Sequence, residues 1–413
     1  MPLICFSGNF KERAMSKILF FNIPAYGHTN PTLPLVAELV HRGEQVIYYS
    51  SEAFQPAIER AGATFRSVAN FFNEQTSVDE NLVRFAYTLI QATQEIIAAI
   101  LSDVIADKPD YIIYDSLCIW GKCIAQILKV PAISSVTTIV RPTSLLHREV
   151  LASLPTMIRM SLAGRVELAK FLAITDQLHK TYHIPRPPLA DVYNNLAELN
   201  IVYSTKQLQM YPNEFNESYK FVGPFIGIRA EAPPFPFDEA GNEPFIYISL
   251  GTVFNNNVHF YRLCVEAFAD SKYRVILSVG SKIEIASLGA IPNTFIIKPF
   301  VPQLQVLQRA ALFITHSGMN SVSEGLYEGV PLLMIPQAAD QMFIAQRVQQ
   351  LGAGKILRNT KVNAQSLRKA AEEILAYHTF RQASVALGAS FRQSGGPKLA
   401  ADEIEIFKRK HGI

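Results

Sequence analysis

The chain has 413 residues, of which 49% are hydrophobic and 18% are charged, a composition that excludes a disordered protein. The 38 basic and 35 acidic residues leave a net charge of +3, which is too balanced to indicate a nucleic-acid-binding protein. The length exceeds one ordinary hydrophobic core, so we expect two domains of about 200 residues each.

The N-terminal residues predict neither a secretory leader nor a folded element. Lys11, Glu12 and Arg13 stand where a signal peptide would need its apolar centre, so we expect residues 1–16 to be a disordered extension. No run of about 18 uninterrupted apolar residues occurs, so no membrane span is predicted. The four cysteines lack metal-ligand spacing, which favours reduced thiols in a cytoplasmic protein without a metal site.

Short apolar runs alternate with helical patterns through the first half of the chain. This alternation is typical of a parallel sheet covered by helices on both faces. The predicted strands are 17–23, 45–49, 111–114, 132–134 and 201–203. We therefore expect residues 17–229 to form one doubly wound α/β domain.

The alternation restarts after residues 230–244, a Pro-rich segment that predicts an interdomain linker. Residues 245–395 predict a second doubly wound domain, and a helix follows near 397–409. In such sheets ligands bind beyond the carboxyl ends of the strands, so we expect a cleft where two such edges face each other. The strands predicted in the second domain are 245–249, 273–279, 294–298, 312–315 and 332–335.

The turn after the predicted strand 312–315 has the features of a phosphate site. His316 and Gly318 stand at the start of a helix whose free backbone N–H groups and positive dipole favour an anion. Asn320 and Glu324 are four residues apart and share one face of that helix, where a carboxylate can accept hydrogen bonds from ribose hydroxyls. Plain helix capping would explain the small polar residues of this turn, but not Glu324. The turn therefore predicts a site for a nucleoside diphosphate with a sugar attached.

Three stretches carry a resemblance to a known family. They are residues 299–341, the turn Gly-His-Thr-Asn-Pro at 27–31, and Ser-Leu-Gly-Thr at 249–252. In this order they resemble the family 1 UDP-dependent glycosyltransferases of GT-B fold, and most of all the bacterial macrolide and flavonoid glycosyltransferases. The resemblance implies two Rossmann-like domains facing across a cleft. The N-terminal domain would bind the acceptor, the C-terminal domain would bind the nucleotide sugar, and residues 396–413 would return to the N-terminal domain.

His28 lies in a polar turn just beyond the first predicted strand, before a helix that is predicted from about Pro31. An imidazole there can take a proton from a sugar-accepting hydroxyl because it titrates near neutrality, although most histidines in a chain have no such role. The resemblance implies that His28 is the general base. It also implies that Asp115, which follows the strand 111–114, orients the imidazole and stabilises the imidazolium. Asp115 could also be a helix N-cap, and the two roles are compatible.

The resemblance assigns the donor site as well. Phe300 stands where many members have tryptophan, and its smaller ring still stacks on a base, which predicts looser base selectivity. Asp340 and Gln341 would hold the sugar hydroxyls, and the other polar residues would hold the phosphates, the ribose and the uracil. The residues that the resemblance implies for the donor are Thr252, Phe300, Val301, Gln303, His316, Gly318, Asn320, Ser321, Glu324, Asp340 and Gln341.

The implied reaction is the inverting transfer of a hexose, with glucose as first choice, from a UDP-sugar to a hydroxyl of an apolar small molecule such as a macrolide, a flavonoid or another phenolic. The chain has no Asp-x-Asp motif, so neither a metal nor a cofactor beyond the UDP-sugar is expected, and we expect a monomer or weak dimer. The acceptor pocket is predicted from residues 70–94 and 134–188. Their large apolar side chains, which are more often core than pocket, include Phe71, Phe72, Phe85, Tyr87, Met157, Met160 and Phe171.

Two other functions are weighed against this hypothesis. A lipid-linked or cell-wall-precursor sugar transferase of the same fold would show a basic or apolar membrane-facing patch, and none stands out in the sequence. A non-catalytic nucleotide-sugar-binding or activator protein would often lose the base or the sugar-binding pair, and the chain retains both. The absence of GxGxxG, GxxxxGK[ST] and GxSxG argues against a nicotinamide enzyme, a P-loop NTPase and an α/β-hydrolase.

Overall fold

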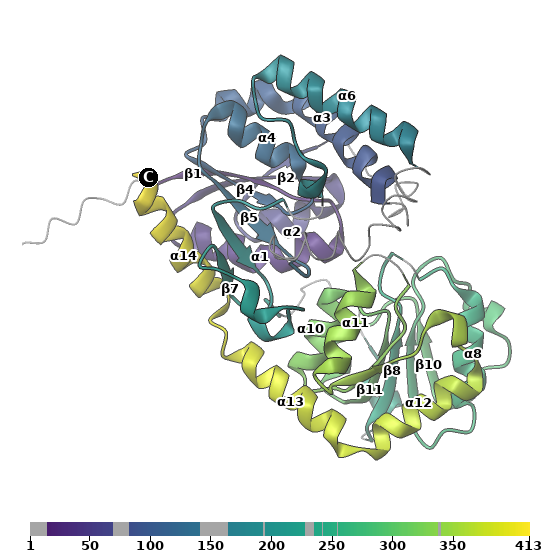
Figure 1. The fold of residues 1–413 in the computed structure, drawn as a ribbon. Coiled ribbons are helices and arrows are strands. Elements are labelled where there is room, and N and C mark those ends of the chain that lie inside the picture. The colour runs from purple at the N-terminus through teal and green to yellow at the C-terminus, as the bar shows by residue number, and fades with distance from the viewer. Residues whose placement is uncertain are drawn as a thin grey trace, which may run out of the picture.

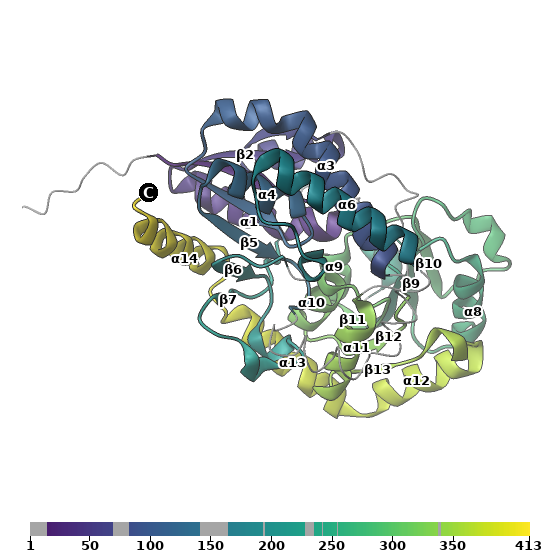
Figure 2. The same ribbon diagram turned by 45° about the horizontal axis from the view of Figure 1, so that its top comes forward.

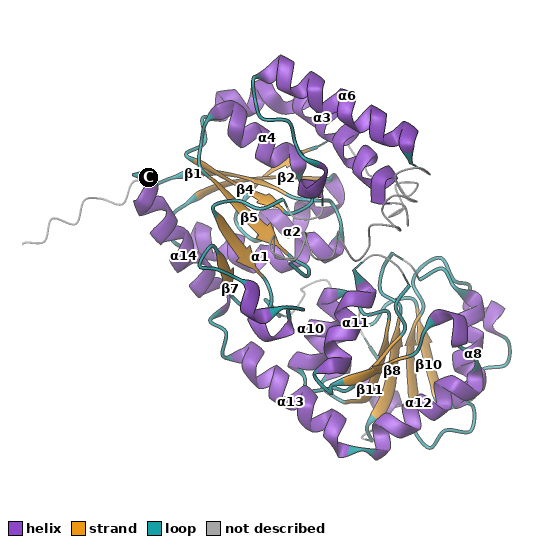
Figure 3. Cartoon of the chain, viewed as in Figure 1, coloured by secondary structure: helices purple, strands orange, loops and turns teal. Residues whose placement is uncertain are grey.

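The computed structural model describes residues 15–68, 82–140, 164–192, 195–227, 235–241, 243–253, 255–337 and 340–413. Two parallel sheets form two lobes, and each sheet carries helices on both faces, as Figures 1 and 3 show. The predicted fold class of two doubly wound α/β units is confirmed. Residues 1–14 of the predicted extension and 230–234 of the predicted linker lie outside the described residues, as do Phe71, Phe72, Met157 and Met160.

The N-terminal lobe, residues 15–227, is built on a seven-stranded sheet of order β3-β2-β1-β4-β5-β6-β7. Its strands are β1 (Lys17–Phe21), β2 (Gln45–Ser50), β3 (Thr64–Ser67), β4 (Tyr111–Asp115), β5 (Ala132–Val136), β6 (Leu199–Val202) and β7 (Tyr219–Phe221). Its helices are α1 (Tyr26–His41), α2 (Gln55–Arg60), α3 (Leu82–Asp107), α4 (Ile119–Leu128) and α6 (Arg165–Tyr182), with short 3-10 turns η1 to η4 at Glu52–Phe54, Leu189–Val192, Lys206–Leu208 and Pro212–Glu214.

Side chains of the central strand β1 alternate between two cores. Leu19 and Phe21 pack beneath α3, α4 and α6, whereas Ile18 and Phe20 pack beneath α1, α2 and the C-terminal helix α14 (Gly396–His411). All strand pairs in this sheet are parallel, so β1, β4 and β5 end at the same edge. At that edge lie His28, in the first turn of α1, and Asp115, the last residue of β4.

Helix α3 is the one helix of the described residues that is long and apolar enough to span a membrane, over Val83–Asp107. Length and composition alone are weak evidence, since the core helix of a large protein passes the same test. Here α3 packs against α4 and α6, and its residues Leu89, Ile90 and Ile97 are fully buried in the core. Its position therefore accounts for its apolar sequence.

The C-terminal lobe, residues 235–395, has a six-stranded parallel sheet of order β10-β9-β8-β11-β12-β13. Its strands are β8 (Phe245–Ser249), β9 (Val275–Ser278), β10 (Phe295–Lys298), β11 (Ala310–Thr315), β12 (Leu332–Met334) and β13 (Gly354–Ile356). Its helices are α7 (Phe237–Ala240), α8 (Val258–Phe268), α9 (Gln303–Leu307), α10 (Met319–Tyr327), α11 (Gln341–Gln350), α12 (Ala364–Ala376) and α13 (His378–Arg392), with 3-10 turns η5 (Ile285–Leu288) and η6 (Asn359–Lys361).

Helix α1 begins at Tyr26, five residues before the start near Pro31 that the sequence predicted. Pro31 and Pro34 both lie inside the helix. Because proline has no backbone N–H, Pro31 cannot bond the carbonyl of Gly27, four residues earlier, and that carbonyl is left for another donor. The strands β3, β7 and β13 were not predicted, since three or four residues with polar members form no apolar run.

The C-terminal helix α14 packs against α1 of the N-terminal lobe, as Figures 1 and 2 show. Ala400, Ile404 and Phe407 lie in the same core as Ile18 and Phe20. Near the end of the helix, Lys408 forms a buried ion pair with Glu44. The side chain of Lys408 is 4% exposed and that of Glu44 is 8% exposed.

Lys408→Ala would leave the buried Glu44 carboxylate without its cation, so we expect a loss of roughly 3–5 kcal/mol of unfolding free energy. Lys410→Ala is the matched control, because Lys410 is 68% exposed in its pair with Glu198 and should cost less than about 1 kcal/mol. Chemical unfolding followed by circular dichroism measures both variants. Equal losses for both would contradict a special role of the buried pair.

Candidate active site

His28 lies in the first turn of α1, beyond the carboxyl end of β1. Its Nδ1 is 2.8 Å from Oδ2 of Asp115, the last residue of β4. The side chain of His28 is 20% exposed and that of Asp115 is fully buried. The structure thus brings together two residues that are 87 positions apart in the sequence, in the arrangement that the resemblance implied.

Asp115 does not cap the helix that follows it. The N-cap position of α4 is Cys118, and no side chain bonds the first turn there. Asp115 Oδ1 instead accepts a hydrogen bond of 2.8 Å from the backbone N–H of Leu117. The helix-cap interpretation is therefore wrong, and the carboxylate is held by a local turn with Oδ2 directed at the imidazole.

Two opposing effects set the pKa of His28. Burial disfavours the imidazolium and lowers the pKa, while the negative charge and hydrogen bond of Asp115, joined by the charge of Asp340, raise it. The net result is a pKa above the ordinary value for histidine. The carboxylates therefore favour a proton on this ring.

A polar network that the sequence did not reveal lies around and beneath the imidazole. Thr137 follows β5, and its Oγ1 is 3.1 Å from His28 Nδ1 and 3.5 Å from Asp115 Oδ2. The buried Asn22 donates from Nδ2 to the backbone carbonyl of His28 at 3.1 Å and also bonds the hydroxyl of Tyr48. Strand alternation gives no signal for these contacts, because each of them joins residues of different secondary-structure elements.

Across the cleft, His316 follows β11 and lies against two glycines. A Cβ on Gly251 would stand 2.5 Å from Cε1 of the ring, and a Cβ on Gly318 would stand 2.4 Å from Nε2. Gly251 also has φ +77°, a conformation that favours glycine. Burial lowers the pKa of His316 to about 4, so the ring is a neutral N–H donor near pH 7.

The amino end of α10 points at the N-terminal lobe. Its N-cap is Gly318, which supplies no capping side chain, so no side chain there satisfies the first-turn N–H groups. Ser321 is buried in this turn, and Ser317 before it is held at φ +73°. Asn320 donates from Nδ2 to the carbonyl of Gly27 at 3.2 Å, the group that Pro31 leaves unbonded within α1.

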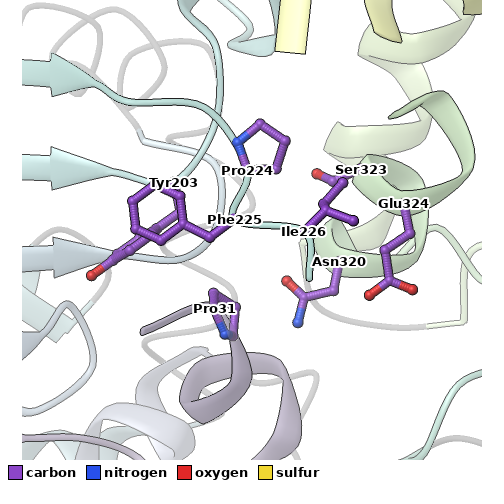
Figure 4. A pocket seen from close by; sticks show the side chains of 8 residues that line it. All are labelled: Pro31, Tyr203, Pro224, Phe225, Ile226, Asn320, Ser323 and Glu324. Atoms are coloured by element: carbon purple, nitrogen blue, oxygen red, sulfur yellow. The ribbon is translucent and has the colours of Figure 1, made fainter. Parts of the chain in front are cut away.

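A pocket lies between the lobes beside these residues (Figure 4). Asn320, Ser323 and Glu324 of α10 line one side of it. The other side is formed by the N-terminal lobe and the segment after β7, with Pro31, Tyr203, Pro224, Phe225 and Ile226. The predicted sharing of one helix face by Asn320 and Glu324 is therefore seen in the structure.

Glu324 and Gln303 are hydrogen-bonded to each other. Gln303 Nε2 donates to Glu324 Oε2 at 2.6 Å, and Tyr247 donates its hydroxyl to Gln303 Oε1 at 2.9 Å. Nearby in the chain, Phe300 is 50% exposed and Val301 is half-buried. Thr252 is exposed in the loop after β8.

The two residues assigned to the sugar differ in their surroundings. Asp340 accepts a hydrogen bond from the hydroxyl of Thr138 in the opposite lobe. Gln341 is buried at the start of α11, and its Oε1 accepts from the backbone N–H of Gln337 at 2.8 Å. Among the acceptor candidates, Phe171 lies in the core, and Phe85 and Tyr87 pack against that core. In the described part of the chain, no three His, Cys, Asp or Glu side chains are grouped to hold a metal.

Comparisons with known proteins agree with this geometry. Residues 263–405 match the family described as erythromycin biosynthesis protein CIII-like, C-terminal domain. An uncharacterized UDP-glucosyltransferase, YojK of Bacillus subtilis, is 33% identical over 403 residues, which cover 96% of this chain and 98% of that protein. The oleandomycin glycosyltransferase of Streptomyces antibioticus is 30% identical over 94% of this chain and 90% of its own length.

A solved structure shows the same fold. The glycosyltransferase of kitacinnamycin superposes with a TM-score of 0.83 at 27% identity, over 95% of this chain and 99% of that one. The similarity spans both lobes and the cleft between them, and it confirms the GT-B fold. The chain belongs to the family 1 glycosyltransferases of GT-B fold, and it is a glycosyltransferase enzyme.

Proposed function

We propose that the protein moves a hexose, with glucose as first choice, from a UDP-sugar to a hydroxyl of an apolar small molecule, and that the transfer inverts the anomeric carbon. The observation that carries the proposal is the His28–Asp115 pair, which lies across the interlobe cleft from the uncapped amino end of α10. One side of the cleft offers a base, and the other offers fixed donors for a leaving diphosphate.

The steps follow from the residues. His28 removes the proton of the acceptor hydroxyl through Nε2, because its Nδ1 faces Asp115. The acceptor oxygen attacks the anomeric carbon as the bond from that carbon to the diphosphate oxygen breaks, and UDP leaves with the electron pair. Asp115 stabilises the imidazolium that forms. The negative charge that develops on UDP meets the N–H groups at the start of α10 and the neutral imidazole of His316.

The donor assignment rests on complementary groups in the C-terminal lobe. Glu324 and Gln303, already paired with each other, suit the ribose, and the half-exposed ring of Phe300 can stack on the base. Asp340 and Gln341 are assigned to the sugar hydroxyls, and Thr252, Asn320 and Ser321 to the phosphates. The name of the Bacillus relative supports UDP-glucose as the donor. In this assignment the α10 dipole and His316 take the place of a metal.

An apolar acceptor is supported by the names of the oleandomycin and kitacinnamycin enzymes, which act on natural products. A cytoplasmic location fits the buried free thiols of Cys118, Cys123 and Cys264. We assign acceptor binding to the N-terminal lobe and donor binding to the C-terminal lobe. The described elements 82–94 and 164–188 would frame the acceptor side.

Incubation of the protein with UDP-glucose and a mixed library of phenolics and macrolides, read by mass spectrometry, should show acceptors that gain one hexose. His28→Ala should lower the rate roughly 10²–10⁴-fold, because the base is lost. Calorimetry should still detect UDP-glucose binding to this variant. His259→Ala, at an exposed histidine of α8, is the control and should transfer normally. Loss of nucleotide binding in His28→Ala would contradict the base role.

The pH profile of kcat/KM tests the electrostatics. His28 acts in its neutral form, and its pKa is raised, so the rate should fall as the pH drops through a midpoint above the ordinary value of 6.5. Asp115→Asn removes the main negative charge while burial still lowers the pKa, so the midpoint should move to lower pH and the maximal rate should fall. An unchanged midpoint in that variant would argue that another group titrates.

Gly251→Ala should weaken UDP binding roughly tenfold, the equivalent of about one hydrogen bond. The new Cβ would stand 2.5 Å from the His316 ring, and φ +77° is strained for alanine. Gly289→Ala is the matched control in the same lobe, since its φ is +90° but nothing lies within 4 Å of the new Cβ. Titration calorimetry with UDP compares the two variants, and equal affinities would refute a role for the His316 ring.

A further inference from the structure

Asp340 stands at the N-cap of α11, a position where aspartate ordinarily bonds the first turn of its own helix. No such bond is present. Its Oδ2 instead accepts a hydrogen bond from Oγ1 of Thr138, which lies just beyond β5 in the N-terminal lobe. The carboxylate that is assigned to the sugar is therefore oriented by a residue of the opposite lobe.

Thr138 also follows directly in the chain after a residue that contacts the proposed base, His28. Its neighbour Thr137 is 3.1 Å from Nδ1 of His28 and 3.5 Å from Oδ2 of Asp115. Two consecutive threonines that follow one strand thus contact both parts of the site. Thr137 contacts His28 and Asp115, and Thr138 contacts Asp340 of the opposite lobe. A second hydrogen bond between the lobes runs from Asn320 to the carbonyl of Gly27, the residue that precedes His28.

A carboxylate can accept about four hydrogen bonds, so one bond from Thr138 leaves capacity on Asp340 for sugar hydroxyls. A hydrogen bond to an ionised group is stronger than one between neutral groups, and it holds the side chain in one orientation. A side chain that is already oriented loses less freedom when the ligand arrives. Because the donor of this bond belongs to the other lobe, the orientation exists only when the lobes are together.

We propose that Thr138 is a positioning residue for the donor sugar, which acts through Asp340 and makes sugar recognition depend on closure of the two lobes. The proposal rests on the proposed function, in which Asp340 binds the sugar hydroxyls. Thr138 contacts no nucleotide group in this assignment. Its effect should therefore be confined to ligands that carry a sugar.

The test compares UDP-glucose with UDP on the full chain by titration calorimetry. Thr138→Val removes the hydroxyl at nearly constant volume and should raise the Kd for UDP-glucose roughly tenfold, while the Kd for UDP stays within about twofold. Thr138→Ser keeps the hydroxyl and should restore UDP-glucose binding. Thr175→Val, at a buried threonine of α6 whose hydroxyl donates to the carbonyl of Leu172, controls for the loss of a buried hydroxyl. Thr138→Ala replaces the valine variant if that protein does not fold.

A double-mutant cycle separates action through Asp340 from a separate contact. If Thr138 acts through the carboxylate, Thr138→Val should have no further effect on UDP-glucose binding in the Asp340→Ala background. Additive losses would overturn the proposal, as would unchanged or tighter UDP-glucose binding in Thr138→Val, or equal weakening of both nucleotides. Wild-type protein that binds neither UDP nor UDP-glucose would instead refute the proposed function itself.

Discussion

The hydrogen bond between His28 Nδ1 and Asp115 Oδ2 is the interaction on which the proposed chemistry depends. It exists because β1 and β4 are neighbours in a parallel sheet and end at the same edge. Its strength comes from burial, since a fully buried carboxylate interacts with the ring in a medium of low dielectric constant. The same burial lowers the pKa of the imidazole, and the carboxylates more than offset it.

The two histidines of the cleft differ because their surroundings differ. His28 has two carboxylates near it, and its pKa is raised. No carboxylate contributes to the pKa of His316, and burial lowers that pKa to about 4. The ring lies against Gly251 and Gly318. One ring is thus suited to accept a proton, and the other to remain a neutral donor. This division is what the proposed transfer requires on the two sides of the cleft.

Two hydrogen bonds between the lobes involve residues that are assigned to the ligands. Pro31 inside α1 cannot bond Gly27, and the carbonyl of Gly27 accepts from Asn320 of α10. Thr138 likewise bonds Asp340. In both cases a group of the proposed donor site is held by the N-terminal lobe. Closure of the lobes and the arrangement of the donor site are consequently linked through these two hydrogen bonds.

The sequence by itself determined the class of the fold and most of the candidate residues. Apolar runs separated by helical patterns predict two doubly wound sheets, because a strand buried on both faces must be apolar throughout. His28, Asp115 and the residues of α10 were identified from their places at strand ends and from a family resemblance. Strands of three or four residues, such as β13, and the early start of α1 at Tyr26 escaped prediction because they carry no apolar run or contain proline.

Only the tertiary structure decided which polar groups meet. Asn22, Thr137 and Thr138 carry no pattern in the sequence, and their partners lie on helix α1, on other strands or in the other lobe. The helix-cap alternative for Asp115 was also decided in three dimensions, by the bond to Leu117. Periodicity reports the environment along one element, whereas a hydrogen bond between distant elements depends on strand order and lobe orientation. Those two features are fixed by the packing of the whole chain.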